Sequence, residues 1–265
     1  MKFVKQLTLS VSILTLAACS SQVIKPMDNA KVTLKETKQY IPMQSFDEKG
    51  QLMPYVPQEN PYLLVDTQLD KGSVLLFIEA KKAKRNKNFK TAVQKLQVIT
   101  QKDTSISGPW VMLGDIKFEK KQYKEAKEDY QKALLINPEN VNAYIALAKA
   151  QRVLGEFNLA QNTLADALQL WQDFPEAHLN LGILYDVYLN QTENAQQHME
   201  AYLFLTQYKN PQVKKWLQEV QSRSGITESF IEKRVAAKIQ QAANDPIGSQ
   251  SNQPEEIQMQ SSKGS

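Results

Sequence analysis

Few side chains in this sequence are suited to nucleophilic or metal chemistry. The 265 residues include two histidines, His178 and His198, and one cysteine, Cys19. Cys19 closes an apolar run at the N-terminus, so we do not expect it to meet a histidine base. The sequence contains no H-E-x-x-H zinc motif, no glycine-rich phosphate loop and no G-x-S-x-G turn. We therefore predict a non-enzymatic protein with no catalytic residue, no metal site and no cofactor.

Charged residues are plentiful but do not form a site. Glu125, Glu128 and Asp129 alternate with lysines at helical spacing, which is typical of a solvated helix face. The chain has 32 Lys and Arg against 28 Asp and Glu, a net charge of +4. That excess falls to +2 if a leader carrying Lys2 and Lys5 is removed, which is too small to indicate nucleic-acid binding.

Residues 1–18 have the layout of a secretory signal. Lys2 and Lys5 provide a positive start, and residues 7–18 form an apolar run. The run has the length of a signal-peptide core and is too short to span a bilayer. The sequence therefore predicts export, with the leader removed.

The end of this run, Leu16-Ala17-Ala18-Cys19, resembles the lipobox of bacterial lipoproteins. The resemblance implies lipidation of Cys19 and anchoring to a membrane, which more than one acyl chain makes stable. Ser20 follows the cysteine in place of aspartate, which implies the outer membrane, with the body of the chain in the periplasm. The alternative is an ordinary signal whose cleavage site happens to precede a cysteine.

Residues 19–72 have the composition of a tether. Proline removes a backbone donor and restricts the residue before it, so a long helix is not expected. Two alternatives remain open: a free linker, or a segment that docks on the folded body through Tyr62–Val65. Five of the eleven prolines fall in this stretch: Pro26, Pro42, Pro54, Pro57 and Pro61.

Residues 73–224 repeat with a period of 34. One column of small residues is Ala80, Gly114, Ala148 and Gly182. A second is Ala92, Ala126, Ala160 and Ala195, with one extra residue before the last. The bulky columns are Leu76, Trp110, Tyr144 and His178, and Leu96, Tyr130, Leu164 and Met199. Small residues let two helices approach, and large residues fill the space between units, so the period predicts stacked helix pairs. His178 is then expected to be a packing residue and His198 to lie on the surface.

The unit at residues 108–144 resembles the tetratricopeptide repeat (TPR). Trp110, Leu113 and Gly114 match the start of its pattern, and Ala126, Tyr130, Ala133 and Pro138 match the remainder. Lys117 departs from it, where the pattern has tyrosine. The resemblance implies an all-α solenoid of about four units over residues 73–224.

The ends of the array are predicted from helix signals. Asn137-Pro138 and Asn210-Pro211 each predict a helix start, and Val213, Trp216, Leu217 and Val220 form the apolar stripe of a capping helix that ends near Ser224-Gly225. The extra residue of the fourth unit is expected in the turn at residues 189–192. The pattern of residues 225–243 predicts an amphipathic helix, packed on the array or on a partner. Residues 244–265 are rich in Gln and Ser, which predicts a disordered tail.

In proteins that this sequence resembles, the first helices of the units line a concave, peptide-binding surface. The candidate groove residues are Phe77, Lys81, Lys84, Val111, Asp115, Phe118, Ile145, Lys149, Arg152 and Asn180. The same columns continue through Leu179, Ile183 and Asp186, with Asn142 alongside. This mixture of apolar and basic residues suits a peptide with acidic side chains or a free carboxylate. Val111, Ile145 and Leu179 stand where the carboxylate clamp of the family has lysine. The alternative is that these are simply exposed helix faces.

A basic run, Lys81, Lys82, Lys84, Arg85, Lys87 and Lys90, has two interpretations: a solvated turn, or a contact with anionic lipid or cell-wall polymer.

We expect a membrane-anchored scaffold or adaptor that binds envelope proteins and does not bind nucleic acid. The overall plan also resembles pilotin lipoproteins, which would imply an assembly factor for a type IV pilus or a related outer-membrane secretion complex. An enzyme is the third alternative, and the lack of catalytic residues argues against it.

Overall fold

The computed structural model describes residues 32–47, 49, 51–64 and 70–231. Its helices are α1 (Pro61–Leu64), α2 (Lys71–Arg85), α3 (Phe89–Lys102), α4 (Gly108–Glu119), α5 (Tyr123–Ile136), α6 (Val141–Val153), α7 (Phe157–Leu170), α8 (Pro175–Ile183), α9 (Thr192–Leu205) and α10 (Pro211–Ser224). A 3₁₀ turn η2 (Lys38–Tyr40) and a π-helical turn η3 (Leu184–Tyr188) are further helical elements, and Phe230 and Ile231 are helical at the end of the described chain. The signal at 1–18, Cys19, residues 232–243 of the expected amphipathic helix and the tail at 244–265 lie outside the described residues.

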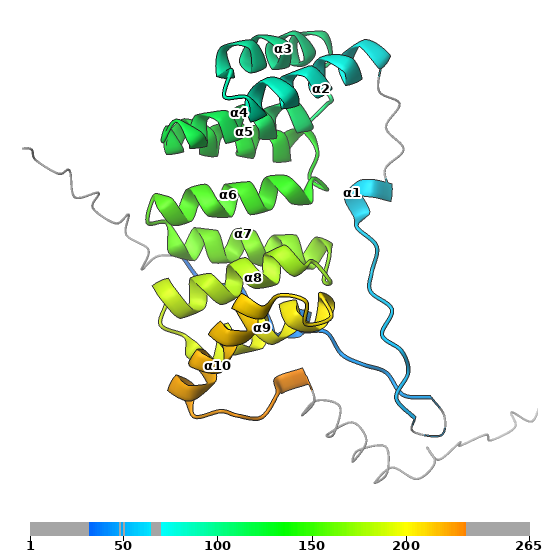
Figure 1. The fold of residues 1–265 in the computed structure, drawn as a ribbon, viewed down its shortest axis with the longest axis vertical. Coiled ribbons are helices and arrows are strands. Elements are labelled where there is room, and N and C mark those ends of the chain that lie inside the picture. Colours follow the sequence, from blue (N-terminus) through cyan, green and yellow to red (C-terminus); the bar gives the residue numbers. More distant parts are fainter. Residues whose placement is uncertain (1–31, 48, 50, 65–69, 232–265) are drawn as a thin grey trace, which may run out of the picture.

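Helices α2 to α9 form four antiparallel pairs that stack in sequence order, and α10 packs against α9 (Figure 1). The predicted all-α solenoid of four units with a capping helix is confirmed. None of the helices in the described ranges is long and apolar enough to cross a membrane.

The periodic columns of small and large residues meet inside each pair. Ala80, Ala148 and the opening alanines of the second helices are almost fully buried, and so are the large residues opposite them. The backbone at Gly114 lies so close to Tyr130 that an added Cβ would stand 2.5 Å from the ring. Gly182 is similarly close to Met199, at 2.9 Å. Tyr130 and Met199 therefore face a glycine, whereas Leu96 and Leu164 of the first and third units face an alanine.

The turn inside each pair also repeats. Lys87, Lys121 and Gly155 occupy the left-handed region at φ of 59°, 62° and 78°, one period apart, and Asn190 does so in the fourth unit. A single left-handed residue reverses the chain after the first helix, and the identical geometry keeps successive pairs in register.

Two helix boundaries differ from expectation. Asn137 ends α5, and the N-cap of α6 is Asn140, whose side chain accepts a hydrogen bond from the Ala143 amide. The prediction of a helix start at Asn137-Pro138 was therefore wrong by three residues. Buried Asn140 also donates to the Ser107 hydroxyl at 3.0 Å, which ties the starts of α4 and α6 together. At the other site Asn210 caps α10 as predicted, and Gly225 ends it at φ 72°.

The extra residue of the fourth unit lies inside its first helix, which corrects the predicted position in the turn. The helix widens into η3, where the Leu189 amide donates to the Leu184 carbonyl five residues back. A π turn absorbs one inserted residue without breaking the helix. It places Tyr185 in the core with its hydroxyl toward the N-terminal segment.

Residues 32–64, which we call the strap, contact the third and fourth units. Asn162 and Gln161 of α7 bond the backbone at Thr33 and Lys35, and Lys35 pairs with Asp166. Ile41 is buried against Ala201 and Phe204 of α9 and against Ile231. Farther along, Asp173 accepts from the Tyr55 hydroxyl and the Gln58 amide.

The strap docks mainly outside the stretch expected from the sequence. Of residues 62–65, Tyr62 is half-buried against the array, Leu63 and Leu64 are exposed, and Val65 is outside the described residues. Contacts at residues 33–58 replace the expected ones, because buried side chains of α7, α9 and the α7–α8 loop need polar partners that the strap supplies.

Both histidines are buried, which confirms the packing position of His178 and makes the surface prediction for His198 wrong. Their Nδ1 atoms are 2.9 Å apart. His178 Nε2 faces the Gln172 carbonyl, so it carries the proton and its Nδ1 accepts from His198. His198 Nε2 then accepts from the Thr37 hydroxyl at 2.9 Å, and Thr37 lies 3.0 Å from the Tyr185 hydroxyl. The pair thus joins the strap to the array with both rings neutral.

The helix approach at Gly114 can be tested by a double-mutant cycle. Gly114→Ala should lower the free energy of unfolding by about 1–3 kcal/mol, because its methyl group overlaps the Tyr130 ring. Adding Tyr130→Leu reproduces the Ala–Leu pairing of the first and third units and should recover much of the loss. Urea denaturation of the two single variants and the double variant measures the coupling. Additive effects would contradict this packing.

The buried histidines predict a loss of stability in acid. Burial lowers the pKa of His178 to about 4 and that of His198 well below its usual value. The unfolded chain, with histidine pKa values near 6.5, takes up protons first as pH falls. The contribution of the two neutral histidines to the free energy of unfolding is fully present above about pH 6.5. It is lost as pH falls toward 4, by about 3 kcal/mol for His178 alone.

The free energy of unfolding should therefore fall between pH 6.5 and 5 in the native chain. The variant His178→Gln/His198→Gln should be less stable at pH 7.5 but show a flatter dependence over the same interval. Equal slopes for the two proteins would show that the histidines do not titrate as the structure implies.

Candidate functional site

A groove crosses the first helices of the first three units. Its larger cavity has a volume of about 640 Å³ and is lined by Phe77 of α2, Val111, Met112 and Asp115 of α4, and Asn142, Ile145, Ala146 and Lys149 of α6, with Asn140 before α6, Gly108, Asn60, Tyr62, Trp171, Phe174 and Glu176 around them. A smaller cavity of about 200 Å³ adjoins it and is lined by Lys84, Asp115, Phe118, Glu119, Tyr130, Ala146 and Lys149. We call the two together the first-helix groove.

The 34-residue period explains why these residues converge. Phe77, Val111 and Ile145 occupy the same turn of successive first helices, and Asp115 and Lys149 lie one turn farther on. Because the pairs stack in register, equivalent side chains of α2, α4 and α6 point to the same side. The structure thus brings together seven of the ten groove residues expected from the sequence: Phe77, Lys84, Val111, Asp115, Phe118, Ile145 and Lys149.

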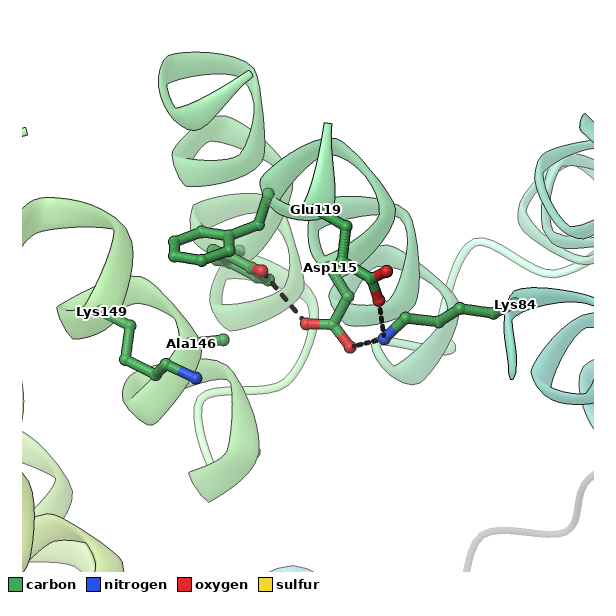
Figure 2. A pocket seen from close by; sticks show the side chains of 7 residues that line it. Lys84, Asp115, Glu119, Ala146 and Lys149 are labelled. Atoms are coloured by element: carbon green, nitrogen blue, oxygen red, sulfur yellow. Dashed lines mark hydrogen bonds and ion pairs between the residues drawn. The ribbon is translucent and has the colours of Figure 1, made fainter. Parts of the chain in front are cut away.

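The charges at one end of the groove are already paired. Figure 2 shows Lys84 bridging two carboxylates, with its Nζ 2.6 Å from Asp115 and 3.8 Å from Glu119. Asp115 also accepts from the Tyr130 hydroxyl at 3.1 Å. Burial, with the carboxylate of Asp115 beside it, raises the pKa of Tyr130, so this hydroxyl stays protonated and remains a donor. Lys84 is therefore not a free cation for a ligand, contrary to the sequence-based interpretation.

Lys149 is the cation of the groove that keeps its charge available. Its side chain is exposed, and its Nζ lies 5.9 Å from the centre of the Phe118 ring. It makes no ion pair with any carboxylate of the described residues, and in Figure 2 it lies across the cavity from Asp115. An acidic group entering the groove would meet Lys149 beside the apolar surface of Val111 and Ile145.

The other three candidate residues lie elsewhere. Lys81 is exposed on α2 and lines neither cavity, and the Arg152 guanidinium lies 5.6 Å over the Tyr188 ring. Asn180 donates to the Glu176 carbonyl within its own helix. The columns of groove residues do not continue into the fourth unit, because α10 covers that end. Asp186 there pairs with Arg223 and accepts a hydrogen bond from the Trp216 indole. The groove is thus shorter than the four-unit surface expected.

Two aromatic residues of the α7–α8 loop, which were not predicted from the sequence, close the groove. Trp171 and Phe174 stack with ring centres 4.6 Å apart, and the Trp171 indole donates to the Gln58 carbonyl of the strap. The sequence did indicate these two residues, because they are aromatic at positions where the preceding unit has Asn137 and Asn140. The contributions of Asn60 and Tyr62 had no periodic signal.

Asp129 corrects the interpretation of the acidic residues as a solvated face. Its carboxylate is buried and lies 2.7 Å from Lys117 of α4. Burial raises its pKa, an effect that Lys117 partly offsets. It therefore links the two helices of the second unit.

The groove combines an apolar floor, side-chain amides and one available lysine, a set suited to binding a peptide segment. Among the residues that the structure describes, no group of three histidine, cysteine, aspartate or glutamate side chains is placed to hold a metal ion.

Comparisons with known proteins agree with this architecture. A family model described as a TPR repeat matches residues 114–155. A crystal structure of MamA protein aligns with a TM-score of 0.51 at 16% identity over 68% of this chain and 98% of that chain. A MamA RS-1 double mutant aligns at 0.51 with 15% identity, over 66% of this chain and 96% of that one. MamA from Desulfovibrio magneticus RS-1 gives 0.50 and 15%, over 66% and 97%.

A search of curated protein sequences finds no significant match. The structural similarities, at these identities, concern the fold alone. The fold places the chain in the class of α-solenoids built from helical hairpins. The TPR model matches residues 114–155 of this solenoid, and stacked repeats of that kind form extended surfaces that bind other proteins.

Proposed function

We propose that this chain is a membrane-anchored scaffold of the bacterial envelope that holds a segment of a partner protein in its first-helix groove. The observation that carries the proposal is the 640 Å³ cavity shared by three consecutive first helices. Its apolar residues would contact alternate side chains of an extended segment, and the amide of Asn142, which also lines it, could bond the backbone of that segment.

Lys149 defines the chemistry of the partner segment. An unpaired ammonium beside Val111 and Ile145 favours an apolar side chain followed by an aspartate, a glutamate or a C-terminal carboxylate. Lys84 would contribute little, because Asp115 and Glu119 already neutralise it.

The anchor belongs to the same proposal. Cys19 precedes the first described residue by 13 positions, a chain that spans at most roughly 45 Å when fully extended. A lipid on Cys19 would therefore keep the array near the membrane, where the local concentration of envelope proteins is high and a modest affinity suffices.

The groove is tested by capture of envelope proteins from a detergent extract. Lys149→Glu should reduce recovery of specific partners about tenfold, the effect of losing one favourable charge contact worth about 1.4 kcal/mol. Lys124→Glu, an equal charge reversal on the exposed side of α5, should leave recovery unchanged. Arg152→Glu should also have little effect, since Arg152 is outside the groove.

Undiminished capture by a correctly folded Lys149→Glu variant would reject the groove as the binding site. Competition with a synthetic peptide ending in leucine and a free carboxylate provides an independent check, because it should displace the same partners from the native chain.

The anchor is tested separately by labelling cells with radioactive palmitate. Label should appear on the native chain and be absent from Cys19→Ser, which should also leave the outer-membrane fraction. Labelling that survives the substitution would refute lipidation at this residue. The alternative, a pilotin that delivers a secretin to the outer membrane, stays a prediction. It is tested by looking for secretin multimers in a strain that lacks this protein, and normal multimers would remove it.

A further inference from the structure

The first helix of the array exposes one continuous face. α2 packs on α3 and α4, and in the described part of the chain no helix covers its opposite side (Figure 1). At 100° per residue, seven of its residues fall within an arc of about 120°. This α2 stripe consists of Lys71, Val74, Leu75, Ile78, Lys81, Lys82 and Arg85, all of them exposed.

The apolar part of the stripe is unusually open. Val74, Leu75 and Ile78 are 38%, 55% and 61% exposed, although the residues equivalent to Leu75 in the later first helices, Pro109, Ala143 and Ala177, are all buried. Beside it opens an apolar cavity of about 170 Å³ lined by Val74 and Ile78 together with Tyr62, Phe77, Ile99, Ile106 and Pro109. The end of the array thus offers apolar contact area to a neighbour.

The charged part of the stripe has a single sign. Lys71, Lys81, Lys82 and Arg85 make no ion pair with any described carboxylate. The acids of this region are used elsewhere: Glu79 lies off the stripe and pairs with Lys95, and Asp70 caps the helix and pairs with Lys102. The stripe is therefore apolar in its middle, basic at both ends, and lacks acidic residues.

We propose that the α2 stripe docks the array on an anionic lipid surface. Helices that lie in a membrane interface combine apolar side chains, which enter the headgroup boundary, with Lys and Arg that meet lipid phosphates. A cell-wall polymer would match the cations but leave Leu75 and Ile78 without a favourable contact. The inference stands on α2 itself and does not require lipidation of Cys19.

The test uses the chain from residue 19 onward with Cys19→Ser, so that neither the leader nor an acyl chain contributes. Co-sedimentation is measured with vesicles of phosphatidylglycerol and phosphatidylethanolamine, and with neutral phosphatidylcholine vesicles. We expect binding at least tenfold stronger to the anionic vesicles, and weaker binding at high salt.

Two variants separate the apolar and basic parts of the stripe. Leu75→Gln/Ile78→Gln and Lys81→Glu/Lys82→Glu/Arg85→Glu should each reduce binding about tenfold while retaining the melting temperature, since all five residues are exposed. Lys124→Glu/Lys214→Glu/Lys215→Glu makes the same change in charge on α5 and α10 and should bind like the parent.

Equal binding to neutral and anionic vesicles, or full binding by the stripe variants, would overturn the inference. Binding to purified cell-wall sacculi but not to vesicles would also overturn it, because the occupant would then be the polymer. A dimer that dissociates in Leu75→Gln/Ile78→Gln would do the same, because the stripe would then bind a second copy of the chain. Partner capture through Lys149 is expected to survive the stripe variants, so failure of the docking and failure of the groove are distinguishable.

Discussion

The structure depends on the close approach of two helices at a small residue in every unit. At Gly114 the approach leaves no room for a methyl group beside Tyr130, and at Ala80 and Ala148 it leaves room for one beside a leucine. Because the size of the small residue is matched to that of its partner, all four pairs close to a similar geometry. Uniform pairs stack in register, and only stacking in register brings Phe77, Val111 and Ile145 into one groove.

The strap makes the third and fourth units part of a larger folded body. Thr37, Tyr185, Gln161 and the two histidines form a buried polar network in which each donor has an acceptor. Buried polar groups are costly when unpaired, so the network favours one position of the strap over others. The π turn η3, which sets the position of Tyr185, connects an inserted residue in the fourth unit to this contact.

The two proposed contact surfaces differ in chemistry and position. The first-helix groove is concave and partly open, with Lys84 neutralised and Lys149 available, which suits a peptide segment that carries an acidic group. The α2 stripe is open and basic and continues over the length of a helix, which suits an extended anionic surface. α10 and its pair between Arg223 and Asp186 close the other end of the array, so the two ends of the solenoid are not equivalent.

The repeat architecture could be predicted from the sequence alone. The small and large residues recur every 34 positions, and such contacts are local, made between helices adjacent in the chain. Seven of ten groove residues follow from the same period. The Asn-Pro signal of a helix start was correct at Asn210-Pro211, but at Asn137-Pro138 it misplaced the start of α6 by three residues.

Contacts between distant segments were decided only by the tertiary structure. Nothing periodic marks Thr37 as the partner of His198, 161 residues away, or Asp173 as the acceptor for Tyr55. The burial of Asp129 beside Lys117 and the neutralisation of Lys84 depend on side-chain reach between neighbouring helices. A one-dimensional period specifies which face a residue occupies, but the partner that reaches that face, and so the charge left available, follows from packing in three dimensions.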